Sequence, residues 1–216
     1  LELLKSRLHE PVAHAPKLTK LYTHNINVDA YNDFELSNIQ KEEKIYRITE
    51  HGPEELVNFL KKSYPAVGEL KLKVGAVVMF IKNNFDSGYV NGTLGEVVDF
   101  DDGGYPIVKT RNKEKIVAMP SSWNIEEDEV VLASIRQVPL RLAWAITVHK
   151  SQGMSLDAAE IDLSKSFERG MGYVALSRVR SLSSIRLMGI NEMALQVNEQ
   201  VVKKDKDFKI LSEQNK

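Results

Sequence analysis

LAWAITVHKSQGMSLDAAEIDLSKSFERGMGYVALSRVRSL, residues 142–182, is the stretch that decides the fold. An apolar run over residues 143–148 leads into the polar, glycine-containing segment His149–Gly153, which is typical of a buried strand that ends in a turn. A second block, YVALSRVR at residues 173–180, predicts a short helix that presents arginines from an otherwise apolar surface. Turns at strand ends and arginine side chains are where α/β proteins place phosphate chemistry.

Together, the two blocks resemble two motifs of the superfamily 1 helicases, in particular those of the PIF/RecD-type branch. A third stretch, Leu21–Asn25 followed by Val28, Asp29 and Asn32, is similar to the motif that opens the second motor domain of that family. The resemblance extends from about residue 18 to about residue 200. It implies an α/β fold: a RecA-like second motor domain with a parallel sheet and flanking helices, from a protein that moves 5′ to 3′ on single-stranded DNA.

Three residues of these blocks are expected to meet the nucleotide. The resemblance implies that Arg178 is a catalytic arginine finger, which stabilises the charge that builds up on the transferred phosphoryl group. It also places Gln152 and Gly153 beside the nucleotide, with Gly153 near the γ-phosphate. The residues alone leave other interpretations open, since Arg178 would also suit an exposed helix and Gly153 an ordinary turn. Arg180 is either an assistant to Arg178 or a surface arginine.

Seven polar residues are expected to contact DNA, and all of them follow or end predicted strands. Hydroxyl, imidazole and ammonium groups at a strand end can bond to phosphate oxygens. Because the carboxyl ends of parallel strands share one edge of a sheet, we expect the two groups to converge there. The alternatives are that Asn25 caps the following helix and that the histidines are structural. The residues are Thr23, His24, Asn25, Thr147, His149, Lys150 and Ser151.

Between the two predicted halves of the motor domain, the sequence pattern changes. From residue 72 to residue 133 no convincing helix is predicted, and five short strands follow one another at roughly ten-residue spacing, with turn signals at 91–92 and 102–104. Such spacing indicates a small antiparallel barrel, and the family resemblance implies an SH3-like one. The expected domains are therefore a remnant of the first motor domain at residues 1–17, the discontinuous second motor domain at 18–71 and 134–216, and the inserted barrel at 72–133.

Composition limits the classes of function. The 216 residues include 29 lysines and arginines against 30 aspartates and glutamates, so a DNA site must be local and not a global basic field. The absence of cysteine excludes disulfides and thiolate metal sites, and no metal-binding site is expected. No apolar run has the length of a membrane span. We expect an intracellular protein, cytoplasmic if bacterial, that acts as a monomer.

The phosphate-cradling pattern GxxxxGK[ST] does not occur in the sequence. A complete helicase motor uses ATP and Mg²⁺ through such a loop and an acidic motif, and in the resembling family both precede the region seen here. We therefore expect the chain to be the C-terminal half of a helicase core, inactive as an ATPase without the missing N-terminal motor domain. The alternative is a degenerate, nucleotide-free paralogue.

Two further hypotheses compete with a helicase motor part. One is an ATP-independent module that binds nucleic acid or protein through a barrel and an α/β scaffold. The other is an independent enzyme that uses His149 as a base, which the sequence disfavours because it offers no partner acid or nucleophile motif. A Walker A motif upstream in the same reading frame would favour the motor, whereas a start codon near residue 1 would favour the module.

Overall fold

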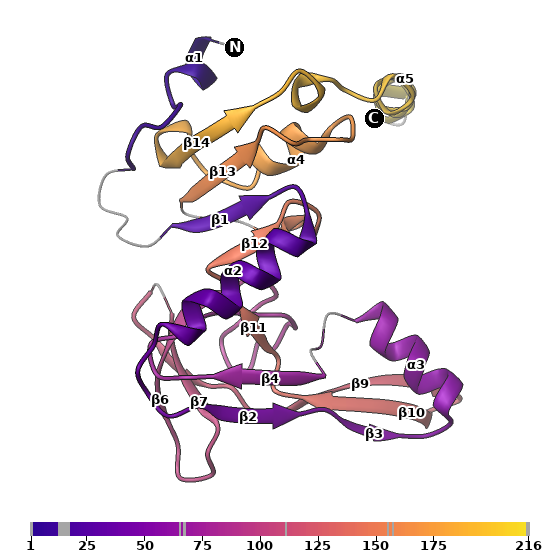
Figure 1. Cartoon of the computed structure of the whole chain (residues 1–216). Helices are drawn as coiled ribbons and strands as arrows, with labels where there is room; N and C mark the ends of the chain where they lie inside the picture. The colour runs from indigo at the N-terminus through magenta and orange to yellow at the C-terminus, as the bar shows by residue number, and fades with distance from the viewer. Residues whose placement is uncertain are drawn as a thin grey trace. The chain divides into compact units, whose positions relative to one another are not determined.

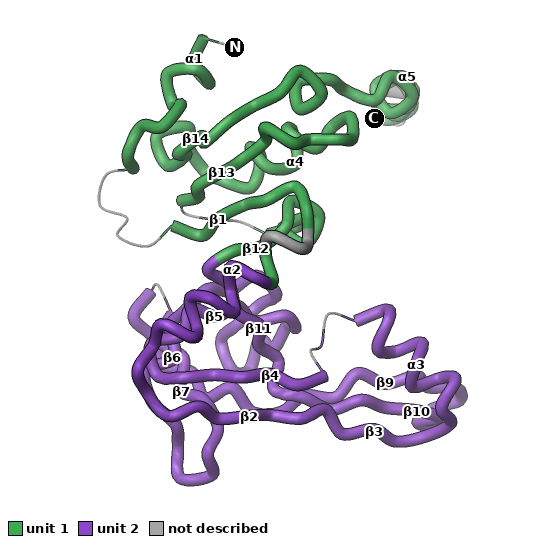
Figure 2. The backbone as a smooth tube through the Cα atoms, in the orientation of Figure 1, with its two compact units in different colours: residues 1–29, 145–216 green, residues 30–144 purple. Residues whose placement is uncertain are grey.

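The chain forms two compact units, each with its own sheets (Figure 2). A computed structural model describes residues 2–12, 18–64, 66, 68–110, 112–154, 156 and 158–214. Unit 1 consists of residues 1–29 and 145–216, and unit 2 consists of residues 30–144. The chain therefore leaves unit 1 once, builds the whole of unit 2 and returns.

Unit 1 is built on a parallel four-stranded sheet with the order β12-β1-β13-β14 (Figure 1). Its strands are short and mostly apolar on both faces, as expected when a parallel sheet is covered on both sides. All three pairings are parallel, so the four strands end at one common edge. The strands are β1 (Thr19–Tyr22), β12 (Ala145–Thr147), β13 (Ala159–Leu163) and β14 (Ile185–Ile190). The sequence-based prediction of a parallel α/β fold is confirmed for this unit.

The helical segments of unit 1 are short except for the last one. Gly172, in α4, packs so closely against Ala194, in η3, that an added Cβ would lie 2.0 Å from the Ala194 carbonyl oxygen. The side chains of helix α5 are exposed from Glu199 to Ser212. The segments are α1 (Glu2–Lys5), η1 (His149–Ser151), α4 (Met171–Leu176), η2 (Leu182–Ser184), η3 (Met193–Leu195) and α5 (Glu199–Gln214), while α2 (Asn25–Ser37) runs from unit 1 into unit 2.

The described part of the N-terminal segment is tied to the outer strand of this sheet. Leu8 forms a parallel bridge with Leu187 of β14, and backbone hydrogen bonds join Leu187 N to Arg7 O and His9 N to Leu187 O at 3.0 and 2.7 Å. The Arg7 side chain also donates to the Ile185 carbonyl oxygen at 2.9 Å. Residues 7–9 thus continue the sheet of unit 1. Residues 13–17 of the expected first-domain remnant lie outside the described residues.

Unit 2 is dominated by antiparallel sheets. A five-stranded sheet has the order β11-β5-β6-β7-β8, a three-stranded sheet the order β3-β10-β9, and β2 pairs with β4. Helix α3 (Glu54–Ser63) accompanies them and begins after Pro53, a residue suited to a helix start, and the larger part of α2 also lies in this unit. The strands are β2 (Lys44–Arg47), β3 (Thr49–His51), β4 (Glu69–Leu72), β5 (Val77–Phe80), β6 (Leu94–Phe100), β7 (Pro106–Thr110), β8 (Lys115–Val117), β9 (Ser121–Glu127), β10 (Val130–Gln137) and β11 (Leu140–Leu142).

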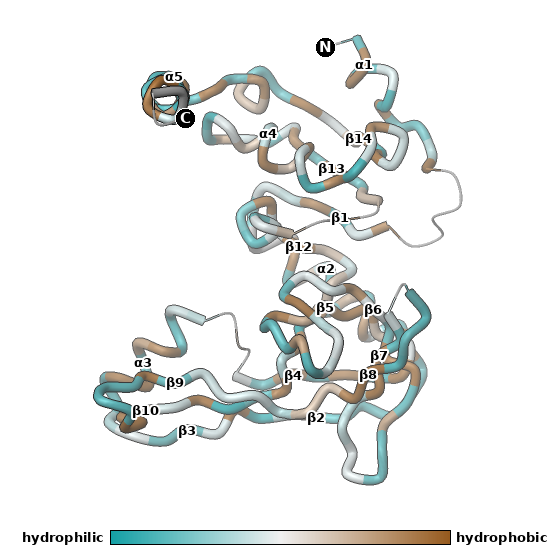
Figure 3. The backbone as a smooth tube through the Cα atoms, turned by 180° about the vertical axis from the view of Figure 1, so that it is seen from behind, coloured by the Kyte–Doolittle hydropathy of each residue, from teal (hydrophilic) through white to brown (hydrophobic). Residues whose placement is uncertain are grey.

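A hydrophobic cluster joins the five-stranded sheet to β4 and α2. Apolar residues recur along these strands (Figure 3), and inside the cluster the ring of Phe80 stacks on that of Tyr89, with centroids 4.0 Å apart. Trp144 belongs to the same cluster and is 8% exposed. Tyr89 is 3% exposed and also belongs to the core.

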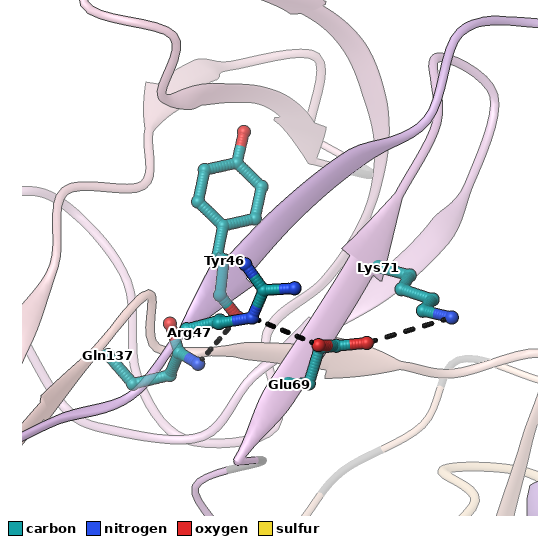
Figure 4. Close-up of polar contacts among 5 residues, drawn as sticks. All are labelled: Tyr46, Arg47, Glu69, Lys71 and Gln137. Carbon is teal, nitrogen blue, oxygen red and sulfur yellow. Dashed lines mark hydrogen bonds and ion pairs between the residues drawn. The ribbon is translucent and has the colours of Figure 1, made fainter.

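Polar contacts reinforce the pairing of β2 with β4 and link it to β10 (Figure 4). Glu69 accepts from Arg47 Nε at 3.1 Å, and its other oxygen lies 3.7 Å from Lys71 Nζ. The side-chain amide of Gln137 donates to the Tyr46 carbonyl oxygen at 3.0 Å. The Tyr46 hydroxyl donates to the Gly104 carbonyl oxygen at 2.6 Å, and burial, followed by the nearby Asp101 charge, raises the pKa of Tyr46 to about 12.

The antiparallel unit is larger than the insertion expected at residues 72–133. No helix occupies that span in its described part, and none of its strands joins the parallel sheet, as expected. However, the unit also includes residues 30–71 and 134–144, because β2 pairs with β4 and β3 pairs with the distant β10. Residues 142–148 were expected to form one strand. They instead end β11 at Leu142 and begin β12 at Ala145, in different units.

Candidate nucleic-acid and nucleotide site

The two groups of predicted DNA contacts lie at the same edge of the parallel sheet. Tyr22 of β1 stands in register with Thr147 of β12, and the strands are parallel. Val148 N then donates to Tyr22 O at 2.9 Å, so the segments that follow β1 and β12 leave the sheet side by side. Residues more than a hundred positions apart in sequence therefore meet, as predicted from the shared edge of parallel strands.

On the β1 side of this edge, a buried threonine orients an exposed histidine. Thr23 is 6% exposed, and its Oγ1 lies 2.8 Å from Nδ1 of His24, whose side chain is exposed. When the hydroxyl donates to Nδ1, the imidazole carries its proton on Nε2, the nitrogen free to donate to an outside acceptor. Asn25 begins helix α2, and its side chain lies outside the described residues.

The β12 side of the edge is a tight turn whose hydroxyl groups are used internally. Lys150 N donates to Thr147 Oγ1 at 3.2 Å, and Ser151 Oγ donates to Val148 O at 2.7 Å. Thr147 is 2% exposed and Ser151 is fully buried, so both hydroxyls hold the turn. His149 and Lys150 are exposed on its outside. Sequence reasoning grouped all four residues as contacts and did not separate the two that face inward.

His149 has a carboxylate partner from a different strand end. Its Nε2 lies 3.3 Å from Glu168 Oε2, and both side chains are more than half exposed. An ion pair this exposed contributes little to stability. Its importance is geometric, because it marks His149 as a group that already holds an anionic oxygen at this edge.

Two residues at the edge were not predicted from the sequence. Phe167 follows β13, is 56% exposed, and has its ring centroid 5.0 Å from that of His24 and 6.1 Å from that of His149. Its neighbour Glu168 pairs with His149. Both lie in the segment SKSFERG, which lies between the two motif blocks and belongs to neither. The only sign of Phe167 in the sequence was an aromatic residue shortly after a predicted strand.

The predicted nucleotide residues lie on adjoining turns. Gln152 and Gly153 are exposed and follow η1, and Gly153 has φ +80° with open space where a Cβ would stand. A glycine in this conformation leaves the backbone accessible to a phosphate group. Leu156 N donates to Arg178 O at 2.7 Å, and Leu156 forms a parallel bridge with Val179, so the turn of Gly153 and the Arg178 segment are joined.

Arg178 lies in the turn after α4, because the helix ends at Leu176 and not near residue 180 as expected. Its side chain caps the C-terminal end of the helix, because Nε donates to Val174 O at 2.9 Å. Nη1 donates to Met154 O at 3.3 Å. Nη2 donates to Ser177 Oγ at 3.0 Å. The guanidinium is partly buried and thus bonds to both motif blocks, which sequence reasoning did not anticipate. Arg180 is exposed.

In the part of the chain that the structure describes, neither a metal cluster nor a membrane-spanning helix is found. Within the described ranges, no three histidine, aspartate or glutamate side chains are grouped so that they could hold a metal ion. Among the same residues, no helix is long and apolar enough to cross a membrane.

Comparison with known proteins identifies the family. The family model "DNA helicase Pif1, 2B domain" matches residues 55–100. The "ATP-dependent DNA helicase Pif1" of Psychrobacter sp. (strain PRwf-1) is 41% identical over 90% of this chain and 37% of its own length. The "ATP-dependent DNA helicase PIF1" of Danio rerio is 39% identical over 93% of this chain and 32% of its own length. The chain thus spans about a third of the length of these relatives.

Solved structures agree with the sequence relatives. Unliganded Pif1 from Bacteroides sp superposes with a TM-score of 0.82 at 30% identity, over 96% of this chain and half of that one. Bacteroides sp Pif1 in complex with ADP-AlF4 gives 0.80 at 31% identity, over 97% of this chain and 49% of that one. Bacteroides Pif1 bound to ssDNA gives 0.68 at 30% identity, over 98% of this chain and half of that one. These neighbours fit a RecA-like assignment for the parallel sheet. The chain belongs to the Pif1-type branch of the superfamily 1 DNA helicases.

Proposed function

We propose that this chain is the part of an ATP-dependent, 5′-to-3′ DNA helicase that supplies an arginine finger and half of the single-stranded DNA track. The observation that carries the proposal is the register of β1 with β12, which brings His24, His149 and Lys150 to one sheet edge. Relatives named as ATP-dependent DNA helicases, and a solved relative bound to ssDNA, support it.

In this proposal, DNA is held through its phosphates at the strand ends. His24 and His149 present ring nitrogens, and Lys150 adds a positive charge beside them. The buried Thr147 and Ser151 keep the turn in shape, and Thr23 orients His24. Such contacts are electrostatic and independent of sequence, so affinity should fall steeply with salt.

The nucleotide side of the proposal uses Gln152, Gly153 and Arg178. A solved relative in complex with ADP-AlF4 supports the use of ATP by the complete protein, with Mg²⁺ as the expected partner ion. Gly153 would let the backbone approach the γ-phosphate, and Arg178 would exchange part of its present hydrogen bonding for the phosphoryl oxygens. An arginine finger cannot by itself position the attacking water, so the proposal assigns no hydrolysis to this chain alone.

The decisive experiment is His149→Ala in the complete helicase. We expect about tenfold weaker binding of single-stranded DNA and less DNA-stimulated ATP hydrolysis, because a hydrogen bond to a charged group is lost. The affinity for nucleotide without DNA should not change. His51→Ala, an exposed histidine on β3 of unit 2, is the matched control and should behave like the parent. Unchanged DNA affinity in His149→Ala would remove the DNA track from this edge.

A further inference from the structure

Three aromatic rings gather at the proposed DNA edge, from three different strand ends. His24 follows β1, His149 follows β12 and Phe167 follows β13. The Phe167 ring lies near both imidazoles, with centroid distances of 5.0 Å to His24 and 6.1 Å to His149 and interplanar angles of 47° and 37°. Single exposed apolar side chains are common and need no explanation. A cluster assembled from three strand ends, at an edge with a separate reason to bind ligand, is a different case.

The central ring is held by its neighbours in the chain. Ser166 is buried, its backbone N donates to Leu163 O at 3.2 Å, and its carbonyl oxygen accepts from Asn191 Nδ2 at 2.8 Å. On the other side, Glu168 pairs with His149. The chain on both sides of Phe167 is therefore tied to neighbouring residues, while 56% of the Phe167 surface faces water. A ring positioned in advance loses little conformational entropy when a ligand covers it.

The surrounding charges indicate which part of a nucleotide the ring faces. Glu168, the residue next to Phe167, carries a carboxylate whose side chain is 63% exposed. A phosphate on His149 Nε2 would have to take the place of that carboxylate, which lies 3.3 Å from this nitrogen, whereas the uncharged face of a base beside Phe167 would not be repelled by it. His24 and Lys150, at the same edge of the sheet, offer further phosphate contacts. The arrangement suits a strand whose backbone follows the histidines while one base turns toward Phe167.

We propose that Phe167, flanked by His24 and His149, is a stacking platform for one base of the bound single strand. The inference rests on the proposed function, which places single-stranded DNA at this edge. It adds a contact that depends on the presence of a base, although not on which base, because every base has a flat π face. Phosphate contacts alone would bind a strand without bases equally well.

The test uses the complete helicase and two oligonucleotide probes of equal length, oligothymidylate and a fully abasic deoxyribose-phosphate strand. Phe167→Leu keeps an apolar side chain but removes the π face, and Phe167→Trp keeps the π face. We expect Phe167→Leu to bind oligothymidylate about tenfold more weakly and Phe167→Trp to bind it like the parent. The parent, Phe167→Leu and Phe167→Trp should bind the abasic strand with equal affinity and the same salt dependence. Phe208→Ala, on α5 of the same unit and 62% exposed, is the control and should match the parent.

The outcomes separate this inference from the proposed function. Equal affinity of Phe167→Leu and the parent for oligothymidylate would overturn the platform, as would an equal loss on the abasic strand. If His149→Ala still weakened binding of both probes, the DNA track would stand without the platform. If neither His149→Ala nor Lys150→Ala weakened binding of either probe, the proposed function itself would fail. Thermal unfolding of each variant shows that affinity, and not folding, has changed.

Discussion

At the scale of single residues, Arg178 combines a structural contact with a proposed catalytic one. Its three donor nitrogens bond to Val174, Met154 and Ser177. Two of these acceptors, those of Val174 and Met154, are backbone carbonyl oxygens. Loss of the guanidinium should therefore lower stability as well as any contribution to catalysis. An experiment on Arg178 must measure the two effects separately.

We expect Arg178→Ala in the complete helicase to lower kcat for ATP hydrolysis by about a thousandfold or more, because an arginine finger acts on the transition state. Nucleotide affinity should fall only modestly. Steady-state kinetics and nucleotide titration measure these changes, and urea unfolding measures the stability loss, expected at about 1–3 kcal/mol. Arg169→Ala is the control, since Arg169 bonds to Gln196 away from these carbonyls. A near-normal kcat would leave Arg178 with its structural role only.

Tyr46 should make stability depend on alkaline pH. Its folded-state pKa of about 12 lies above the ordinary value of 10, so the folded chain holds the hydroxyl proton more tightly than the unfolded chain. The resulting stabilisation is fully present below pH 10 and is lost as pH rises from 10 toward 12. In Tyr46→Phe, the fall of unfolding free energy over this window should be smaller than in the parent. Denaturant unfolding at stepped pH measures it, and equal slopes would contradict the assignment.

At the scale of elements, the sequence predicted strand ends better than it predicted what faces outward. The apolar runs before Thr23 and His149 were sufficient to place both residues at one edge, because parallel strands share it. The pattern could not show that Ser151 turns inward, since its hydroxyl bonds to a carbonyl three residues back in a turn that only the fold defines. Nor could it select Phe167, whose importance depends on rings from two other strand ends.

The end of helix α4 shows why boundaries near a site are hard to predict. The apolar spacing of residues 171–180 favours a longer helix, but the chain after Ser177 is drawn into a bridge between Val179 and Leu156. The Arg178 side chain also binds the Val174 carbonyl oxygen. The bridge is a tertiary contact with a residue about twenty positions upstream, and the Arg178 bond is a side-chain contact at the helix end itself. Local propensity contains neither of them.

The packing of α4 against η3 should tolerate no side chain at Gly172. A Cβ there would lie 2.0 Å from the Ala194 carbonyl oxygen, a backbone atom that cannot move without shifting η3. We expect Gly172→Ala to lower the free energy of unfolding by about 3 kcal/mol, at the upper end of typical overpacking costs. Chemical denaturation measures it. Gly68→Ala is the control, because nothing lies within 4 Å of the added Cβ and its effect should be small.

At the scale of the whole molecule, the sequence predicted an antiparallel insertion but not its extent. The change from helical to alternating pattern after residue 72 was visible along the chain. It was not visible that residues 44–51 belong to the same antiparallel unit. This is because β3 pairs with β10 across more than eighty positions and β2 pairs with β4. Pairings of high sequence separation leave no local mark. Strand β9 pairs with its chain neighbour β10, and no pattern had distinguished it as a separate strand.

The last prediction concerns the independence of unit 2. Its hydrophobic cluster is made of residues from 31 to 144, and its strand pairings are all internal. A chain of residues 25–144, which keeps α2 whole, should therefore fold by itself. Both tryptophans of the sequence, Trp123 and Trp144, lie in this unit and are buried, so their fluorescence reports on unit 2. We expect one cooperative denaturant transition. Val97→Ala, a fully buried core change, should lower its free energy of unfolding by about 1–3 kcal/mol, both in the fragment and in the full chain. A fragment without a cooperative transition would show that unit 2 needs unit 1 to fold, and the chain would then be a single folding unit despite its separate sheets.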